Sequence, residues 1–371
     1  MVSIERQSVK VLSVFLVLAM LAAAVLLSGT GTVIGAAYGG GGGGVVAGSA
    51  SGTATAAAGG TIALGDGSVK VALPAGAVSA DVTVTISPVD KVTQNMAGYI
   101  KVGSAIYELV AETADGTPVT SFDKPVTLEF TYKDADLGNT AEANLMVYYW
   151  DTAFKAWIAV PTSVDKAGNK ATATVSHFTV FALLDSTVFT RFNDMAGHWA
   201  EGDVLKLSSL GVTKGYADGG YHPGDVITRA QFTNLMAIAA GLSPVADPQL
   251  TFADADKIPV WSRGYVAAGI KAGLINGYPD NTFRPDDPID RAQMAKLLAG
   301  VLKLKNKLPS TAGGSFTDSD KIPGWAKDSV GQASAAGLIK GNPDGSFAAD
   351  RTAIRAEAAT MISRLMDRLT K

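Results

Sequence analysis

The last half of the chain repeats itself three times, at an interval of about sixty residues. In every copy an arginine follows a tryptophan by 30 residues, and an aspartate within FND, FAD or FTD precedes both. The repeated residues are Trp199, Trp261 and Trp325; Arg229, Arg291 and Arg355; and Asp194, Asp254 and Asp318. Because this spacing is so regular, the fold has to be interpreted as three equivalent units that pack on one another.

Helical periodicity follows each repeated arginine. The residues three, six, seven and ten positions after it are apolar in every copy: Phe232, Leu235, Met236 and Ala239; Met294, Leu297, Leu298 and Val301; Ala358, Met361, Ile362 and Leu365. Such a stripe is one buried helix face, so we expect a pseudo-threefold bundle of three helices. A shorter helix should follow each tryptophan and end at a left-handed glycine, at Gly211, Gly273 or Gly337.

Residues 61–185 have the two-residue period of strands. Runs such as SVKVALP, DVTVTI and PVTLEFTY alternate apolar and polar residues between Gly, Pro, Asp and Asn, which predicts an antiparallel β-sandwich of seven or more strands. Through PAGA from Pro74, KPVTLEF from Lys124 and HFTVFAL from His177, the region resembles small β-sandwich modules of ankyrins, netrin receptors and bacterial surface proteins. That resemblance implies a fold more than a function.

The first 37 residues have the layout of an export signal. Arg6 and Lys10 precede an apolar run of 17 residues over 11–27, and small residues end at Ala37. This layout predicts a signal peptide over 1–37 and a protein secreted to the cell surface. An uncleaved membrane anchor is the alternative, because the run is near the shortest length that spans a bilayer. The Gly-rich residues 38–60 are predicted to be a flexible linker.

Composition narrows the range of partners. The net charge is −3 with dispersed basic residues, so neither a nucleic-acid surface nor, after signal cleavage, a membrane surface is expected. The chain has no cysteine, which rules out disulfides and thiolate metal sites. Its three histidines have no metal-ligand spacing, and no nucleophile elbow or Walker loop occurs. We therefore expect no cofactor, no metal and no enzyme activity.

The three copies closely resemble the S-layer homology domain. The matching segments are LGVTKGYADGGYHP with ITRAQF, AGLINGYPDNTFRP with IDRAQM, and AGLIKGNPDGSF with AIRAEA, within units over 192–242, 252–304 and 316–371. The resemblance implies an all-α pseudo-trimeric module that docks bacterial surface proteins noncovalently onto a secondary cell-wall polysaccharide, commonly one with pyruvate ketals. Its ligand grooves lie between adjacent repeats, and other surface-layer proteins are further candidate partners.

The repeated residues suit such a ligand. An arginine fork can meet the carboxylate of a ketal with two hydrogen bonds, and the three arginines begin helices, where free N–H groups favour an anion. The tryptophans offer flat faces to a sugar ring, and the aspartates could accept from hydroxyls. Gly219 and Gly345 would let the backbone approach the ligand closely.

Structural alternatives exist for each set. The tryptophans could be core residues, the aspartates helix caps or turn formers, and the arginines partners of those aspartates alone. Gln231, Gln293 and Glu357 are better explained by capping than by binding, as in T-x-x-Q from Thr228. The second copy has Asn281 in place of the glycine, and the third has Ile354 where a cap belongs, so the Arg355 groove is expected to be the weakest.

The sequence thus predicts an exported surface protein that binds a wall polymer through its C-terminal repeats and displays a β-sandwich. Two alternatives stay open at this point. The chain could be a self-assembling S-layer subunit, with the repeats as one of its contacts. It could instead be a surface enzyme with a glycan-active site in the sandwich, because two carboxylates can meet from distant positions.

Overall fold

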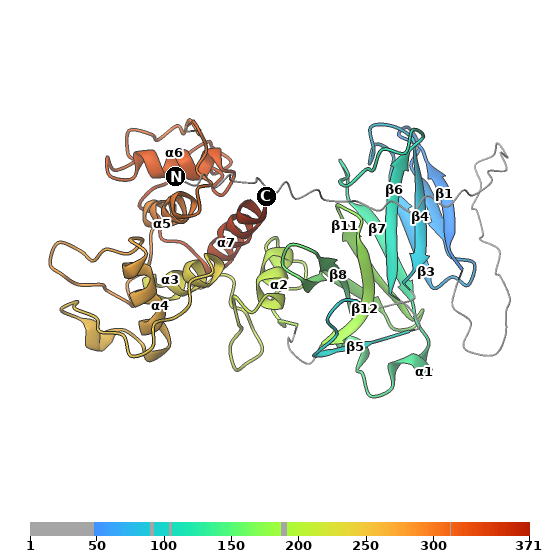
Figure 1. The fold of residues 1–371 in the computed structure, drawn as a ribbon, viewed down its shortest axis with the longest axis horizontal. Helices are drawn as coiled ribbons and strands as arrows, with labels where there is room; N and C mark the ends of the chain where they lie inside the picture. The colour runs from blue at the N-terminus through green and yellow to red at the C-terminus, as the bar shows by residue number, and fades with distance from the viewer. Residues whose placement is uncertain (1–47, 90–92, 104–105, 187–190, 312) are drawn as a thin grey trace, which may run out of the picture. The chain divides into compact units, whose positions relative to one another are not determined.

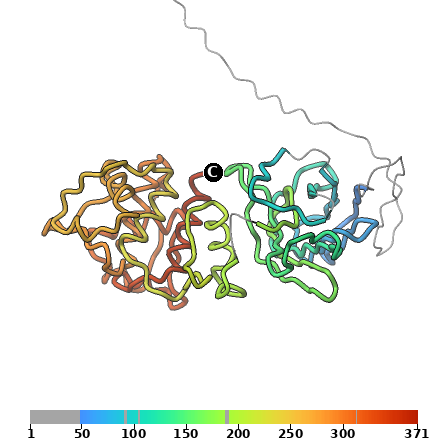
Figure 2. The backbone as a smooth tube through the Cα atoms, turned by 90° about the horizontal axis from the view of Figure 1, so that it is seen from below, coloured from blue at the N-terminus to red at the C-terminus, as the bar shows by residue number. Residues whose placement is uncertain are grey.

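The computed structural model describes residues 48–89, 93–103, 106–186, 191–311 and 313–371. Antiparallel strands come first and helices follow, as the colours of Figures 1 and 2 trace from blue to red. The predicted fold class, β-sandwich and then helical module, is confirmed. The predicted signal peptide lies outside the described residues. Among the helices described, none is long and apolar enough to cross a membrane.

The strands form two antiparallel sheets. They are β1 Ala50–Ala54, β2 Gly60–Ala63, β3 Val69–Leu73, β4 Val82–Pro88, β5 Tyr99–Lys101, β6 Tyr107–Thr113, β7 Val126–Thr131, β8 Met146–Asp151, β9 Ala156–Val160, β10 Thr162–Asp165, β11 Lys170–Val175 and β12 Val180–Ser186. One sheet has the order β1-β4-β6-β12-β8-β9, with β5 also on β12, and the other β10-β11-β7-β3-β2. A short helix α1 (Asp134–Leu137) and a 3-10 turn (Glu142–Asn144) join β7 to β8.

Alternation along the strands places one face of each sheet in the sandwich core. On β3 and β7, Val71 pairs with Leu128 and Val69 with Phe130, and all four side chains are buried. Val84 and Ile86 of β4 enter the same core from the other sheet. The two-residue period therefore identified the inward-facing positions of these strands correctly.

The predicted linker over 38–60 extends too far, because β1 lies inside it. Ala50 and Ala54 are buried, and β1 pairs with β4. The small residues that suggested a tether allow close packing instead. A Cβ built on Gly52 would lie 3.0 Å from Cγ1 of Ile62, so the strand packs closely against Ile62 at this residue.

The helices come in pairs of one short and one long. They are α2 Glu201–Ser209, α3 Arg229–Ala239, α4 Val260–Lys271, α5 Arg291–Leu304, α6 Lys327–Ala335 and α7 Arg355–Thr370, with a 3-10 turn at Ala255–Lys257. The predicted stripe on the long helices is buried except for Leu297, which is half-buried. Gly211, Gly273 and Gly337 have φ of 69°, 70° and 74°, which confirms the left-handed helix ends.

Each long helix packs on the short helix of the next repeat. The pairs are α3 with α4, α5 with α6, and α7 with α2, and α3 also contacts α5 and α7. The third repeat thus returns to the first, which gives the predicted pseudo-threefold arrangement. Each of these described helix pairs therefore draws its two members from different repeats.

A ring of three backbone hydrogen bonds closes this arrangement at its centre. The N–H of Ile227 donates to the carbonyl of Ala353 (3.1 Å), that of Ala353 to Ile289 (3.0 Å), and that of Ile289 back to Ile227 (3.1 Å). All three residues are fully buried. These segments directly precede the long helices. The ring therefore fixes the positions of the helix starts, which are occupied by the repeated arginines.

Candidate functional site

The repeated arginines are the first residues of α3, α5 and α7. Thr228 and Asp290 cap the first two of these helices by accepting the N–H of Gln231 and of Gln293, at 3.3 and 2.7 Å. The capping prediction is confirmed for both. At the third helix Ile354 has no capping oxygen, and the Glu357 carboxylate accepts the Ile354 N–H at 3.2 Å instead.

The first two N–H groups at each of these helix starts are not available to a ligand. The first two N–H groups of each long helix donate to carbonyls in a loop of the neighbouring repeat. These pairs are Arg229 with Asp287 and Ala230 with Pro285; Arg291 with Arg351 and Ala292 with Ala349; Arg355 with Asp225 and Ala356 with Pro223. The expectation of an anion site made by helix N-termini is therefore wrong. Any anion would have to be bound by side chains.

Each arginine side chain also crosses into the neighbouring repeat. Its Nε donates to the carbonyl of a buried aromatic residue, and its guanidinium lies over that residue's ring. The bonds are Arg229 to Phe283 (3.0 Å), Arg291 to Phe347 (2.8 Å) and Arg355 to Tyr221 (2.9 Å). The alternative that the arginines pair only with the repeated aspartates is wrong.

The aspartates hold the loops that receive the arginines. Both oxygens of each carboxylate accept backbone N–H groups, from the buried aromatic residue and from the residue after it. The donors are Tyr221 and His222 to Asp194, Phe283 and Arg284 to Asp254, and Phe347 and Ala348 to Asp318, at 2.7 to 2.8 Å. These bonds lower the pKa of Asp318. The turn-forming alternative thus explains the three aspartates better than hydroxyl binding does.

Gly219 and Gly345 also have a structural explanation. They have φ of 82° and 78°, and their carbonyls accept the N–H of Asn193 and Thr317. In the second repeat Asn281 takes the same role with φ 59°, and its carbonyl accepts from Ala253. The position requires a left-handed turn, which asparagine also tolerates, and this requirement does not involve a ligand.

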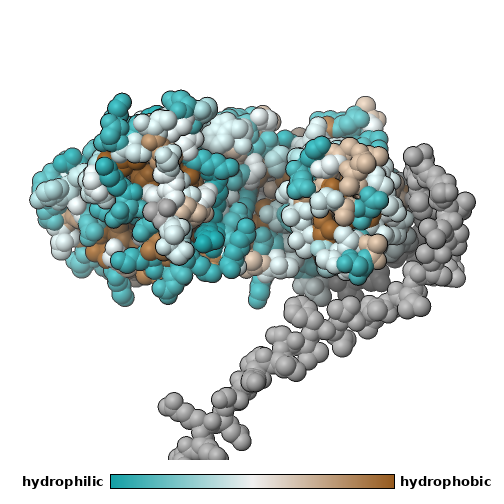
Figure 3. Space-filling model, turned by 90° about the horizontal axis from the view of Figure 1, so that it is seen from above, coloured by the Kyte–Doolittle hydropathy of each residue, from teal (hydrophilic) through white to brown (hydrophobic). Residues whose placement is uncertain are grey.

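The three tryptophans are exposed, with 63, 54 and 53% of Trp199, Trp261 and Trp325 accessible. The alternative that they are core residues is wrong. On the face drawn in Figure 3 the surface is mostly hydrophilic with separate apolar patches. Exposed indoles at three equivalent places are a feature that burial and packing do not explain.

The first groove is a cavity of about 420 Å³ that three repeats build together. Arg229 comes from the first repeat, Tyr278 and Gln293 from the second, and Trp325 from the third. Lys296 also lines it, with Nζ 5.3 Å from the centre of the Trp325 ring. A cation and an aromatic face thus border one concave apolar surface, which is the usual composition of a small-ligand site.

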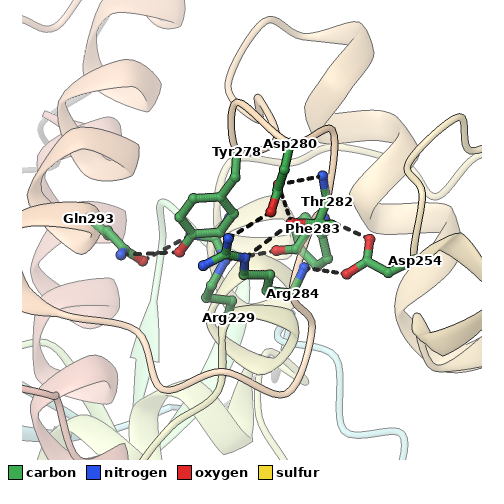
Figure 4. Close-up of polar contacts among 8 residues, drawn as sticks. All are labelled: Arg229, Asp254, Tyr278, Asp280, Thr282, Phe283, Arg284 and Gln293. Atoms are coloured by element: carbon green, nitrogen blue, oxygen red, sulfur yellow. Dashed lines mark hydrogen bonds and ion pairs between the residues drawn. The ribbon is translucent and has the colours of Figure 1, made fainter.

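Side chains orient Arg229 in this groove (Figure 4). Its Nη1 donates to Oε1 of Gln293 at 2.9 Å, and its guanidinium lies 4.6 Å from the Tyr278 ring centre. Gln293 in turn donates to the Tyr278 hydroxyl at 3.4 Å, and Arg284 lies 4.1 Å from the same ring. Burial lowers the pKa of Arg229, yet an arginine stays charged. Its Nη2 donates to no residue in the described part of the chain.

The second groove, around Arg291, is smaller, at about 210 Å³. Arg291 is 3% exposed, and its Nη2 donates to the Lys340 carbonyl at 3.1 Å. Its Nη1 is 3.5 Å from Glu357, which also binds Arg351. Arg364 of α7 lines this groove, and the equivalent position on α5 is Gly300. Every nitrogen of the Arg291 guanidinium is therefore already engaged.

The residues around Arg355 that correspond to those of the first groove include Tyr216 and His222. Arg355 is 4.7 Å from the Tyr216 ring centre, and the hydrogen bonds described for its side chain come from Nε alone. Trp261 is close to the adjacent helix, since Asn234 Nδ2 donates to its carbonyl at 3.4 Å. The sequence pointed to this groove as the weakest. Of the three arginines, Arg291 in the second groove is the one whose guanidinium nitrogens are all engaged by other groups of the described chain.

Sequence reasoning missed three residues of the first groove. Gln293 was assigned to capping, and it does cap, but its amide also orients Arg229. Tyr278 and Lys296 are not repeated in all three copies. The equivalents of Tyr278 are Tyr216 and Asn342, and those of Lys296 are Asn234 and Thr360. A search limited to residues that recur at the same spacing passes over positions that differ between repeats, although those differences distinguish the grooves.

No group of three or more His, Cys, Asp or Glu side chains within the described ranges is arranged to hold a metal ion. Ligand binding by the described residues is thus expected from charged and aromatic side chains.

Comparisons with known proteins agree with the threefold geometry. The family model of the S-layer homology domain matches residues 191–233, 251–295 and 315–359. The S-layer protein EA1 of Bacillus anthracis is 33% identical over 168 residues, covering 45% of this chain and 19% of that protein. Exoglucanase XynX of Acetivibrio thermocellus is 32% identical over 179 residues, covering 48% and 16%.

One relative extends the similarity beyond the repeats. An amylopullulanase of Thermoanaerobacterium thermosulfurigenes is 27% identical over 293 residues, covering 77% of this chain and 15% of the enzyme. The chain spans less than a fifth of the length of each of these three relatives. The helical part of this chain therefore carries three S-layer homology domains.

Proposed function

We propose that the chain is a cell-surface protein whose C-terminal module, with repeat units over 192–242, 252–304 and 316–371, anchors it to the wall by binding a secondary cell-wall polysaccharide. The single observation that carries this proposal is the first groove. There a half-buried arginine, oriented by Gln293 and Tyr278, lies in one cavity with Lys296 and an exposed tryptophan. Similarity to S-layer proteins supports the same assignment.

The chemistry of the groove suits an acidic sugar such as one with a pyruvate ketal. A carboxylate could approach the Nη2 edge of Arg229 and the Lys296 ammonium together, in a partly dehydrated site where charge-assisted bonds are strong. The Trp325 indole would stack against the C–H face of the ring. Binding by such a site needs no catalytic group.

The β-sandwich is proposed to be the displayed or spacer part of the surface protein. The relatives that are named as enzymes share at most 30% of their own length with this chain, so their names do not make this chain a glycan-active enzyme. A self-assembling S-layer subunit is the remaining alternative, and ordered sheets of the purified chain in electron micrographs would favour it.

The experiment is cosedimentation of the full chain with isolated cell walls of the producing bacterium, before and after acid extraction of the non-peptidoglycan polymer. We expect binding to untreated walls and its loss on extraction. A Trp325→Ala variant should bind more weakly than the matched control Trp150→Phe, which changes a tryptophan of the sandwich. Binding that survives extraction would mean that the module binds peptidoglycan or another protein.

A further inference from the structure

Packing requires a glycine in the segment that leads from α4 into the first groove. A Cβ built on Gly277 would lie 2.6 Å from Cε1 of Phe252 and 2.8 Å from the carbonyl oxygen of Thr282. Both separations are shorter than a side chain allows, so any larger residue would displace the loop. The equivalent glycines of the other repeats, Gly215 and Gly341, also lie against a phenylalanine ring.

The residue before each of these glycines differs between the repeats. It is Lys214 in the first repeat, Asn276 in the second and Lys340 in the third. Asn276 and Gly277 thereby form the only Asn-Gly pair in the 371-residue sequence. Both residues are exposed, and both line the cavity of about 420 Å³. The only such pair therefore lies inside the first groove.

Few contacts restrain this pair. Within the described residues, neither the Asn276 side chain nor the Gly277 N–H makes a hydrogen bond. In the second groove the equivalent backbone is held, because Arg291 Nη2 donates to the Lys340 carbonyl at 3.1 Å. Arg229 makes no such bond to Asn276 among the bonds described, since its Nη1 donates to Gln293 at 2.9 Å. The Asn276 amide and the Gly277 nitrogen are thus free to react.

We propose that Asn276 is a site of spontaneous deamidation, through which the first groove loses affinity as the molecule ages. The Gly277 nitrogen attacks Cγ of Asn276, and a new N–C bond forms. The bond from Cγ to the side-chain nitrogen breaks, and ammonia leaves with the proton of the Gly277 N–H. Water then opens the five-membered imide at one of its two carbonyl carbons, which gives aspartate or isoaspartate. Glycine favours the attack because no Cβ hinders the approach of its nitrogen.

Either product places a carboxylate in the cavity that Arg229 and Lys296 also line. This carboxylate would compete with an acidic sugar for the two cations and would repel the charge of the sugar. Isoaspartate also lengthens the backbone by one carbon between Ile275 and Tyr278, which line the same cavity. The loss of affinity rests on the proposed function, whereas the modification itself does not.

The modification is tested by peptide mapping with mass spectrometry after incubation of the full chain, folded in buffer and unfolded in urea. We expect Asn276 of the folded chain to be modified before the other asparagines, with isoaspartate among the products. The reaction should be faster at mildly alkaline pH, because loss of the amide proton activates the Gly277 nitrogen. Asn276→Gln is the control and should stay intact, since its longer side chain would have to close a six-membered ring. An Asn276 that stays intact in the folded chain while the unfolded chain is modified there would overturn the proposal.

The consequence is tested by binding to isolated cell walls. Asn276→Asp should bind about two- to fivefold more weakly than the wild type, the range for exposed charge pairs. Asn306→Asp adds the same charge at an exposed residue after α5, outside the lining of the first groove, and should bind as the wild type does. Equal binding by Asn276→Asp and the wild type would overturn the loss of affinity. A wild-type chain that does not bind walls would instead overturn the proposed function, and the peptide map would still decide the modification.

Discussion

The first and second grooves have the same arginine at the start of a helix, yet they use it differently. Among the described residues Arg229 Nη2 has no acceptor and lies in a cavity of about 420 Å³, whereas Arg291 is 3% exposed with every guanidinium nitrogen engaged. One substitution accounts for much of the difference. Gln293 accepts from Arg229 without a charge, and its equivalent Glu357 forms an ion pair with Arg291. Repetition of a residue therefore does not establish repetition of its function.

The largest expected effect comes from replacing each of the two arginines, Arg229 and Arg291, by alanine and measuring wall binding. Arg229→Ala should weaken wall binding by about 2–5 kcal/mol, the cost of truncating one partner of a buried charge pair. Arg291→Ala should leave wall binding within a few fold of wild type. Equilibrium binding of each variant to isolated walls measures both effects. Equal losses would show that the two grooves are equivalent after all.

The same two variants should differ in stability in the opposite direction, with the larger loss for Arg291→Ala. Arg291→Ala leaves the carbonyls of Phe347 and Lys340 without their buried donor, at a cost of about 1–3 kcal/mol in the free energy of unfolding. Arg229 is less buried, so Arg229→Ala should cost less. Urea denaturation followed by circular dichroism gives the two values. A larger loss for Arg229 would contradict the assignment of Arg291 as structural.

The size of the first groove can be changed without altering the charged side chains of Arg229 and Lys296. Gly300→Leu places on α5 an uncharged side chain at the position that Arg364 has in the third repeat, and it should weaken wall binding about tenfold, or about 1.4 kcal/mol. Gly300→Ala is the matched control. Its Cβ would lie 3.1 Å from the flexible end of Leu274, so binding should change little. The idea fails if both variants bind as the wild type does.

The smallest expected effect is a gain in the second groove. Glu357→Gln gives Arg291 the partner that Arg229 has in Gln293, and a glutamine can still accept the Ile354 N–H. In an Arg229→Ala background we expect wall binding to recover about two- to fivefold, the range of a weak ion pair. The measurement is the same wall-binding assay. No recovery would mean that the ion pair is not what closes this groove.

The sequence predicted those features that depend on local pattern. The strand period, the helix stripe, the left-handed glycines and the arginines at helix starts all follow from residues within a few positions of one another. Burial of the stripe and the φ values at Gly211 and its equivalents confirm them.

The features it missed depend on contacts between residues that are far apart in the chain. Asp254 binds N–H groups 29 and 30 residues later in the chain, and the N–H of Arg229 donates to Asp287 across the bundle. Periodicity does not indicate which loop fills a helix start or whether a tryptophan is left outside. The end of the linker was missed for a different reason, because alanine and glycine are common both in tethers and in tightly packed strands.

The ring formed by Ile227, Ala353 and Ile289 sets a limit on how such a module can evolve. In a solenoid each repeat offers an open end on which another can stack. Here each of the three backbone donors is already paired with another member of the same ring, so a fourth copy finds no edge to join. Loss of one copy would expose the two broken ends of the others. The ring therefore closes the module at three repeats.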